Sequence, residues 1–277
     1  MSTFTSYDGT ELAYRTTGQG EPLLVVPGGP MRDQVYLGDL GGLAEHRTLH
    51  LLSLRGTGAS GVPGDLGTYR VDRQVADVEA FRAHLGLETA DVLGHSAGAN
   101  LAMLYAAAHP ARVAKLALVT PSLRAVGIDF VPDHRREAAS LRTGESWYPE
   151  AWAAMERVLD GEATEDDWDA MEPFFYGRWD DEIRAFAAGA RINEEAIPHY
   201  YAEGAMDPEA TRAALAKLDA PVLVLAGEYD MGPRPSVAAQ AAELFRNGTL
   251  TVQPRAGHFP WLDDPAWFTR TVAAFLA

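Results

Sequence analysis

The sequence contains no cysteine and has few basic residues for its number of acidic ones. Without cysteine the chain has no disulfide framework, no thiolate metal site and no thiol nucleophile, which fits a reducing compartment. Its 23 lysines and arginines stand against 39 aspartates and glutamates, so the formal net charge is −16. Nucleic acids are bound by clustered lysine and arginine, and we therefore expect no nucleic-acid partner.

Long apolar runs are also missing. Residues 1–9 have neither the basic patch nor the apolar stretch of an export signal, and no later run approaches the length of a membrane span. We therefore expect a soluble, cytoplasmic protein with no membrane partner. The chain has no internal repeat and no low-complexity linker, and its 277 residues suffice for one large domain with an insertion.

Apolar strand candidates alternate with helix candidates along much of the chain. The strand candidates are residues 12–15, 22–26, 47–54, 90–93, 113–119, 221–226 and 250–253. The helix candidates are residues 71–85, 100–108, 236–245 and 267–276. Alternation of this kind predicts an α/β fold with a mostly parallel sheet that helices cover on both faces.

The alternation stops between residues 121 and 218. This segment has helical stretches at 152–159 and 181–190, a dense set of aromatic side chains and no clear strand. We predict that residues 121–218 form a helical cap inserted into a core domain made of residues 1–120 and 219–277. Most of the aromatics are expected to form the cap's own core, and a few to face substrate.

Residues 94–98, Gly-His-Ser-Ala-Gly, match the Gly-x-Ser-x-Gly pattern of a serine on a strand-to-helix turn. A strand candidate precedes the motif and a helix candidate follows it, which is the context that the pattern requires. The glycines leave room for strand and helix to cross closely, while the serine takes a strained backbone conformation. We predict that Ser96 is a nucleophile.

A serine hydroxyl needs a base within hydrogen-bond reach and a third group that orients the base. His258 follows a late strand candidate in a glycine-preceded loop, and Asp230 follows the strand candidate before it. In a parallel sheet both lie at the same edge as Ser96, and the order Ser, Asp, His is that of the α/β-hydrolases. We predict this catalytic triad, with Glu228 and Asp263 as nearby alternatives for the acid.

Acyl transfer also requires N–H donors that face the developing oxyanion. Ala97 offers one amide at the start of the helix, and the Pro-Gly-Gly-Pro loop at 27–30 offers another, for which Gly29 is preferred over Gly28. His95 lies within the serine motif and is expected to shape the pocket and contact substrate. We predict neither a metal nor a cofactor.

These features together resemble the α/β-hydrolase superfamily over essentially the whole chain, and more narrowly its proline iminopeptidase branch. The similar segments are residues 28–30, 55–60, 75–79 with 84–86, and 228–233. In that branch the serine attacks the carbonyl after an N-terminal proline while cap carboxylates hold the free amine. The resemblance implies Glu194 and Glu195 for that role, in a segment similar to the family's Ala-Arg-Ile-Glu. The chain departs from the family pattern at Pro27, Met31 and Ala97.

We therefore expect a serine hydrolase that forms and hydrolyses an acyl-enzyme. Its substrate would be a small molecule or a short peptide, and its activity that of an aminopeptidase or an esterase. Two alternatives remain: an esterase or lactonase without peptidase activity, and a small-molecule receptor on the same fold with slow or absent turnover.

Overall fold

A single eight-stranded sheet forms the centre of the computed structural model, which describes all 277 residues. The strand order is β1-β2-β4-β3-β5-β6-β7-β8. The strands are β1 Ser2–Thr5, β2 Glu11–Gly18, β3 Pro22–Val26, β4 Thr48–Leu52, β5 Ala90–His95, β6 Val113–Val119, β7 Val222–Gly227 and β8 Gly248–Gln253. The pairs β1–β2 and β2–β4 are antiparallel, and every other neighbouring pair is parallel. The predicted α/β class is confirmed.

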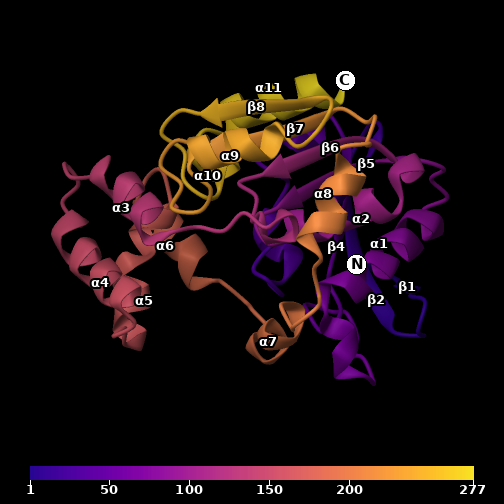
Figure 1. Ribbon diagram of the computed structural model, residues 1–277, viewed down its shortest axis with the longest axis horizontal. Coiled ribbons are helices and arrows are strands. Elements are labelled where there is room, and N and C mark those ends of the chain that lie inside the picture. Colours follow the sequence, from indigo (N-terminus) through magenta and orange to yellow (C-terminus); the bar gives the residue numbers. More distant parts are fainter.

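Helices cover both faces of this sheet (Figure 1). One face packs against α1 Val71–His84, α2 Gly98–Ala108, α8 Pro208–Leu215 and α9 Pro235–Ala242. The apolar core on the other face includes residues of α11 Pro265–Leu276 and α10 Pro260–Asp263, and it extends to α6 Asp181–Ala188. Side chains alternate between the two cores: Leu24 and Val26 of β3 belong to the first, and Leu23 and Val25 to the second.

The chain between β6 and β7 adds no strand to the sheet. It carries α3 Pro132–Ser140, α4 Tyr148–Asp160, α5 Glu165–Met171, α6, α7 Ile197–Tyr200 and α8. Helices α3 to α5 form a lobe at one side of the molecule (Figure 1) with a small apolar core that includes Met155, Met171 and Phe174. Helix α8, although it falls within the predicted cap range, packs against α2 through Leu215.

The aromatic side chains of this segment divide between the lobe and the core domain. Trp147 and Tyr148 pack edge to face against Phe174 inside the lobe. Tyr176 instead stacks on Phe259, with ring centroids 5.1 Å apart, beside the loop that follows β8. The aromatics therefore also attach the lobe to the core domain.

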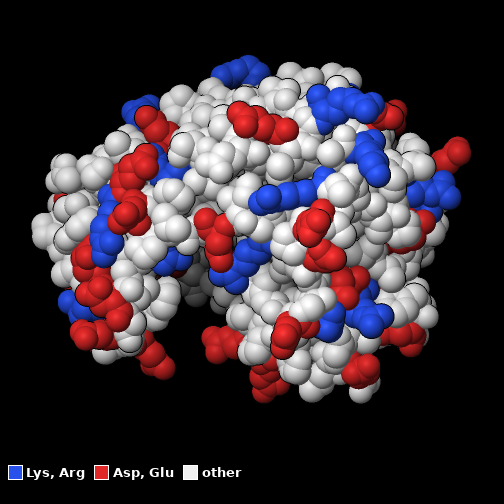
Figure 2. Space-filling view, viewed as in Figure 1, with Lys and Arg blue, Asp and Glu red and all other residues white.

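The molecular surface is hollowed between the lobe of α3 to α5 and the part that carries α7 (Figure 2). Acidic side chains are spread over the visible face and are dense on the lobe. None of the helices combines the length and the apolar character that crossing a membrane requires.

Candidate active site

Ser96 occupies the turn between β5 and α2. Its φ of 53° lies in the left-handed region, where an L-residue persists only if its surroundings hold it. Here the N–H of Ser96 donates to the carbonyl of Val119 at 3.0 Å, and its carbonyl accepts from the N–H of Ser122 at 2.9 Å. Backbone contacts to β6 and the turn after it thus maintain the conformation.

The two glycines of the motif allow α2 to approach the sheet closely. A Cβ atom on Gly98 would lie 2.3 Å from the carbonyl oxygen of Pro27, and one on Gly94 would lie 2.8 Å from the Cα of Ala99. Both separations are too short for non-bonded atoms. The close crossing of β5 and α2 therefore requires glycine at these two positions.

The three side chains predicted as a triad form a continuous hydrogen-bonded chain. The Oγ of Ser96 is 2.8 Å from Nε2 of His258, and Nδ1 of His258 is 3.1 Å from each carboxylate oxygen of Asp230. Asp230 is fully buried, and its Oδ1 also accepts the N–H of Gly232 at 2.7 Å. Asp230 and His258 follow the parallel strands β7 and β8. Both therefore lie at the edge of the sheet where the carboxyl end of β5 carries Ser96.

The two alternative acids have other partners. Glu228 accepts a hydrogen bond from a backbone N–H of the loop after β8 at 2.7 Å. Asp263 accepts from the N–H groups of Gly177 and Gly257, at 2.9 and 2.7 Å, and burial raises the pKa of its carboxyl to about 6. Asp230 is the acid that contacts the imidazole.

Two backbone N–H groups beside Ser96 are free to serve as oxyanion donors. Neither Gly29 nor Ala97 donates its N–H to an acceptor within the protein. The N–H of Gly28 is engaged, because it donates to the hydroxyl of Tyr36 at 2.7 Å. Gly29 lines a cavity of about 70 Å³ together with Ser96. The geometry therefore favours Gly29 over Gly28.

His95 is buried, and both of its ring nitrogens are engaged within the protein. Its Nε2 is 2.9 Å from the carbonyl of His258, which can only accept, so Nε2 carries the proton and Nδ1 accepts from the hydroxyl of Tyr36 at 2.7 Å. Burial and the neighbouring His258 ring hold the pKa of His95 well below its ordinary value, and it stays neutral. His95 lines the cavity, but its nitrogens link Tyr36 to the loop of His258 rather than facing substrate.

Comparison with known proteins shows the family to which the chain belongs. Residues 21–265 match the sequence family described as alpha/beta hydrolase fold. The chain belongs to this family. It is similar to the proline iminopeptidase of Levilactobacillus brevis, with 26% identity over 92% of this chain and 88% of the relative. It is also similar to the pimeloyl-[acyl-carrier protein] methyl ester esterase of Chromobacterium violaceum, with 29% identity over 96% and 98% of the two chains.

A solved structure has the same fold as this α/β-hydrolase. The proline iminopeptidase of Mycobacterium smegmatis superposes with a TM-score of 0.73 and 24% identity, covering 99% of this chain and 97% of that one. The predicted resemblance to the α/β-hydrolases and their proline iminopeptidase branch is confirmed.

The cap segment singled out by that resemblance reaches the hydrolase site through its backbone. Residues 191–193 pair with residues 31–33, just after the Gly-Gly-Pro loop, in an antiparallel bridge centred on Ile192 and Arg32. Two backbone hydrogen bonds of 2.9 and 3.0 Å join the segments. As a result Ile192 lines the cavity at Ser96.

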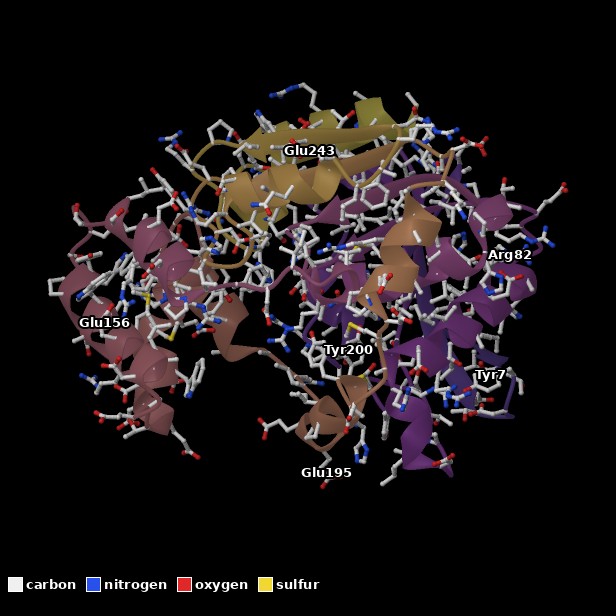
Figure 3. The ribbon with its side chains drawn as sticks, viewed as in Figure 1. Tyr7, Arg82, Glu156, Glu195, Tyr200 and Glu243 are labelled. Carbon is white, nitrogen blue, oxygen red and sulfur yellow. The ribbon has the colours of Figure 1, made fainter.

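Glu194 and Glu195, the two predicted amine ligands, do not approach Ser96. Both side chains are exposed, and neither lines the cavity. Figure 3 shows Glu195 pointing away from the molecule beside α7. Asn193, the residue before them, turns inward instead, and its side chain donates to the carbonyl of Gly56 at 2.9 Å. The structure thus places both glutamate side chains outside the cavity at Ser96.

Three residues that sequence reasoning did not assign also belong to this hydrolase site. Arg32 and Phe259 line the cavity, and Tyr36 both lines it and bonds to His95. Tyr200 of α7 supports the turn from outside the cavity, since its hydroxyl donates to the carbonyl of Ala97 at 3.0 Å. Their positions in the sequence could have indicated two of them: Arg32 comes shortly after the double glycine, and Phe259 comes directly after His258.

No group of three or more His, Asp or Glu side chains is arranged to hold a metal ion. A larger cavity of about 470 Å³ lies between the turn at 124–129 and residues 201–206. No residue of the triad lines it. The small cavity at Ser96 is therefore the one at which the hydrogen-bonded side chains meet.

Proposed function

We propose that this α/β-hydrolase is a serine hydrolase that cleaves small acyl compounds through an acyl-enzyme. The observation that carries the proposal is the hydrogen-bonded chain from the Oγ of Ser96 through His258 to the buried Asp230. Nucleophile, base and orienting acid stand in the order that such chemistry needs, and free N–H groups lie beside them.

In the acylation step the Oγ of Ser96 attacks the substrate carbonyl carbon while its proton passes to Nε2 of His258. Asp230 accepts a hydrogen bond from the Nδ1–H group of His258 and stabilises the imidazolium that forms. The N–H groups of Gly29 and Ala97 donate to the oxyanion. The tetrahedral intermediate then collapses, and the proton on Nε2 goes to the leaving oxygen or nitrogen.

The same groups complete the cycle with water. Water gives a proton to Nε2 of His258 as its oxygen attacks the acyl carbon, and a second tetrahedral intermediate forms. When it collapses, the proton returns to the Oγ of Ser96 and the free acid leaves. The carboxylate of Asp230 keeps its position in both steps, because it is buried and accepts a hydrogen bond from Gly232.

The substrate favoured by the site is an ester or a related small acyl compound rather than a peptide with a free N-terminal proline. Relatives of this chain carry both kinds of name. Amine recognition requires carboxylates, but Glu194 and Glu195 are exposed and outside the cavity. The charged group that does line the cavity is Arg32, which would repel an ammonium.

Covalent labelling tests the nucleophile directly. A fluorophosphonate probe is expected to label the wild-type protein and not Ser96→Ala. Ser236→Ala serves as the matched control, because Ser236 is exposed at the start of α9, and this variant should label as wild type does. Equal labelling of Ser96→Ala, or no labelling of the wild type, would contradict the proposal.

Substrate assays separate the remaining alternatives. p-Nitrophenyl acetate and butyrate should be hydrolysed with a burst of one equivalent or with steady turnover, while proline p-nitroanilide should be a poor substrate. Efficient cleavage of the anilide, reduced when Glu194 and Glu195 are changed to Gln, would restore the peptidase interpretation. A protein that binds such compounds without burst or turnover would be a receptor on this fold.

A further inference from the structure

Arg32 is a buried arginine without an anionic partner. Only 9% of the residue is exposed. Its side chain forms no ion pair and no hydrogen bond within the protein, and its Nε is buried without any acceptor. A buried guanidinium is costly unless its charge is compensated, so an uncompensated one indicates a missing partner.

The other buried arginines show how this chain ordinarily treats such a group. Five more arginines are as buried as Arg32, and each contacts a carboxylate within 4 Å. They are Arg47, Arg55, Arg82, Arg142 and Arg234. With 39 acidic residues in the chain, carboxylates are abundant, yet none is placed against Arg32.

Aromatic rings hold the guanidinium of Arg32 at the cavity. Its Cζ lies 4.4 Å from the ring centroid of Tyr36, 5.3 Å from that of Phe259 and 5.5 Å from that of Phe186. Such faces stabilise a cation without consuming its N–H donors. Arg32 lines the same cavity as Ser96, Gly29 and His258, so its donors remain available beside the reacting groups.

We propose that Arg32 binds a carboxylate carried by the substrate, so that the preferred substrates are esters or related acyl compounds with a second, anionic carboxyl group. A planar carboxylate accepts two parallel N–H bonds from a guanidinium and would supply the missing anion. The cavity of about 70 Å³ suits a compact group of this kind. This inference rests on the proposed hydrolase function and names its substrate class.

Glu172 is the carboxylate of the protein that could compete with a substrate carboxylate for Arg32. It is half-buried in the lobe; burial raises the pKa of its carboxyl, and the positive charge of Arg32 opposes that effect. The two side chains nevertheless form no ion pair within 4 Å, and Glu172 does not line the cavity. Arg32 therefore keeps its charge facing the cavity rather than Glu172.

Two matched pairs of esters test the proposal on each side of the scissile bond. Monomethyl glutarate and methyl 5-methylhexanoate have similar shapes, but only the first has a carboxylate on the acyl side. O-Acetylglycolate and isobutyl acetate make the same comparison on the leaving-group side. We expect kcat/KM to favour the anionic member of at least one pair, measured by proton release.

Substitution of Arg32 should remove this preference. In Arg32→Met the ratio of kcat/KM for the anionic ester to that for its neutral match is expected to fall about 10- to 100-fold, the usual effect of losing a charge-assisted hydrogen bond. The ratio for Arg32→Lys should lie between those of the wild type and Arg32→Met, because lysine keeps the positive charge but lacks the planar pair of N–H donors. Arg270→Met, which removes an exposed arginine from α11, is the control and should keep the wild-type ratio.

A binding measurement distinguishes failure of this inference from failure of the hydrolase proposal. Monomethyl glutarate should raise the Tm of Ser96→Ala, and should not raise that of the Ser96→Ala, Arg32→Met double variant. If no ester is hydrolysed but this Arg32-dependent binding is seen, carboxylate binding stands and the hydrolase proposal fails. Hydrolysis of both pairs without preference, with an unchanged ratio in Arg32→Met, would overturn the carboxylate site alone.

Discussion

The hydroxyl of Tyr36 joins two parts of the site that are far apart in sequence. It accepts the N–H of Gly28 and donates to Nδ1 of His95, each at 2.7 Å, and His95 in turn donates to the carbonyl of His258. The loop that carries Gly29 and the loop that carries the base therefore share one buried network. Such a network fixes geometry well because every polar atom in it is satisfied.

Tyr36→Phe should weaken both catalysis and stability. The change leaves Gly28 N–H and His95 Nδ1 unpaired in a buried place, which costs about 1–3 kcal/mol of stability. If the network positions the oxyanion loop, kcat should fall roughly 10-fold with little change in KM, because the lost interaction acts in the transition state. Ester kinetics and urea unfolding measure the two effects.

Tyr14→Phe is the matched control for this prediction. Tyr14 also places its hydroxyl near a histidine nitrogen, 3.1 Å from Nε2 of His84, but between β2 and α1, outside the cavity. Removal of the Tyr14 hydroxyl should lower the stability of the protein and leave kcat at the wild-type value. If Tyr36→Phe likewise changes only stability, the network has a structural role alone.

The residues of the site differ in how far the sequence could predict them. The proximity of Ser96, Asp230 and His258 could be predicted because each follows a parallel strand within a few residues, and strand order decides which edge of the sheet they reach. Arg32 and Tyr36 were missed because their directions depend on how the turn after β3 packs, which no local pattern encodes. The direction of Glu194 and Glu195 was unpredictable for the same reason: both are exposed, and Asn193 is the residue of that segment that turns inward.

The four helices predicted outside residues 121–218 are all present, whereas α8, within that segment, was missed. The ranges of α1, α2, α9 and α11 agree with the expected segments to within a few residues. The missed α8 begins at Pro208 after Asp207, whose side chain accepts the N–H of Ala210 at 3.0 Å. Asp-Pro is a helix-start signal, because proline in the first turn loses no hydrogen bond.

Among the strands, the sequence reading missed β1. This strand is four residues long, lies at the edge of the sheet and buries only Phe4, so its apolar pattern is too short to recognise. The inner parallel strands β3, β5 and β7 are almost wholly buried and consist mainly of apolar residues, whereas the edge strand β8 is only partly buried. The fold was therefore predictable from its central strands, while the short edge strand β1 was not.

The crossing of β5, β3 and α2 yields a prediction about an element. In Gly98→Ala the new Cβ would meet the backbone oxygens of Pro27 and Val26 at 2.3 and 2.6 Å, so α2 must shift away from the sheet. We expect a loss of roughly 1–3 kcal/mol or more in unfolding free energy, the usual cost of overpacking. Ester hydrolysis should fall as well, because the shift moves Ala97 and Ser96.

Gly144→Ala is the control for this effect. A Cβ at Gly144 meets no atom within 4 Å, and the residue is exposed in the lobe. Its free energy of unfolding, from urea titration, should change by less than about 0.5 kcal/mol. Wild-type stability and kcat in Gly98→Ala would show that α2 tolerates a wider separation from β3 than the structure indicates.

At the scale of the whole molecule, the lobe and the catalytic loop are joined directly. The N–H of His258 donates to the carbonyl of Phe175 at 2.7 Å. Beside it, Asp263 accepts the N–H groups of Gly177 and Gly257 with its two carboxylate oxygens. Two hydrogen bonds thus fix the segment that leaves the lobe to the chain after β8, and Asp263 links one of them to the loop of the proposed base.

Asp263 should make the stability of the folded chain depend on pH. Burial raises the pKa of its carboxyl to about 6, against an ordinary value of 3.8. Between these values the unfolded chain releases the proton more readily than the folded one, so the contribution to stability is complete below pH 3.8 and is lost as pH rises through 6. Relative to Asp263→Asn, the wild type should lose up to about 3 kcal/mol of unfolding free energy between pH 4 and pH 7.

Urea unfolding of both proteins across this pH range measures the difference. Glu243→Gln is the control, because it removes one negative charge from an exposed side chain that forms no ion pair, and so reports the effect of net charge alone. An NMR titration of the Asp263 carboxyl provides a direct check. A midpoint near 4, together with a wild-type and Asp263→Asn difference that stays constant with pH, would mean that the two backbone donors fully compensate the buried charge.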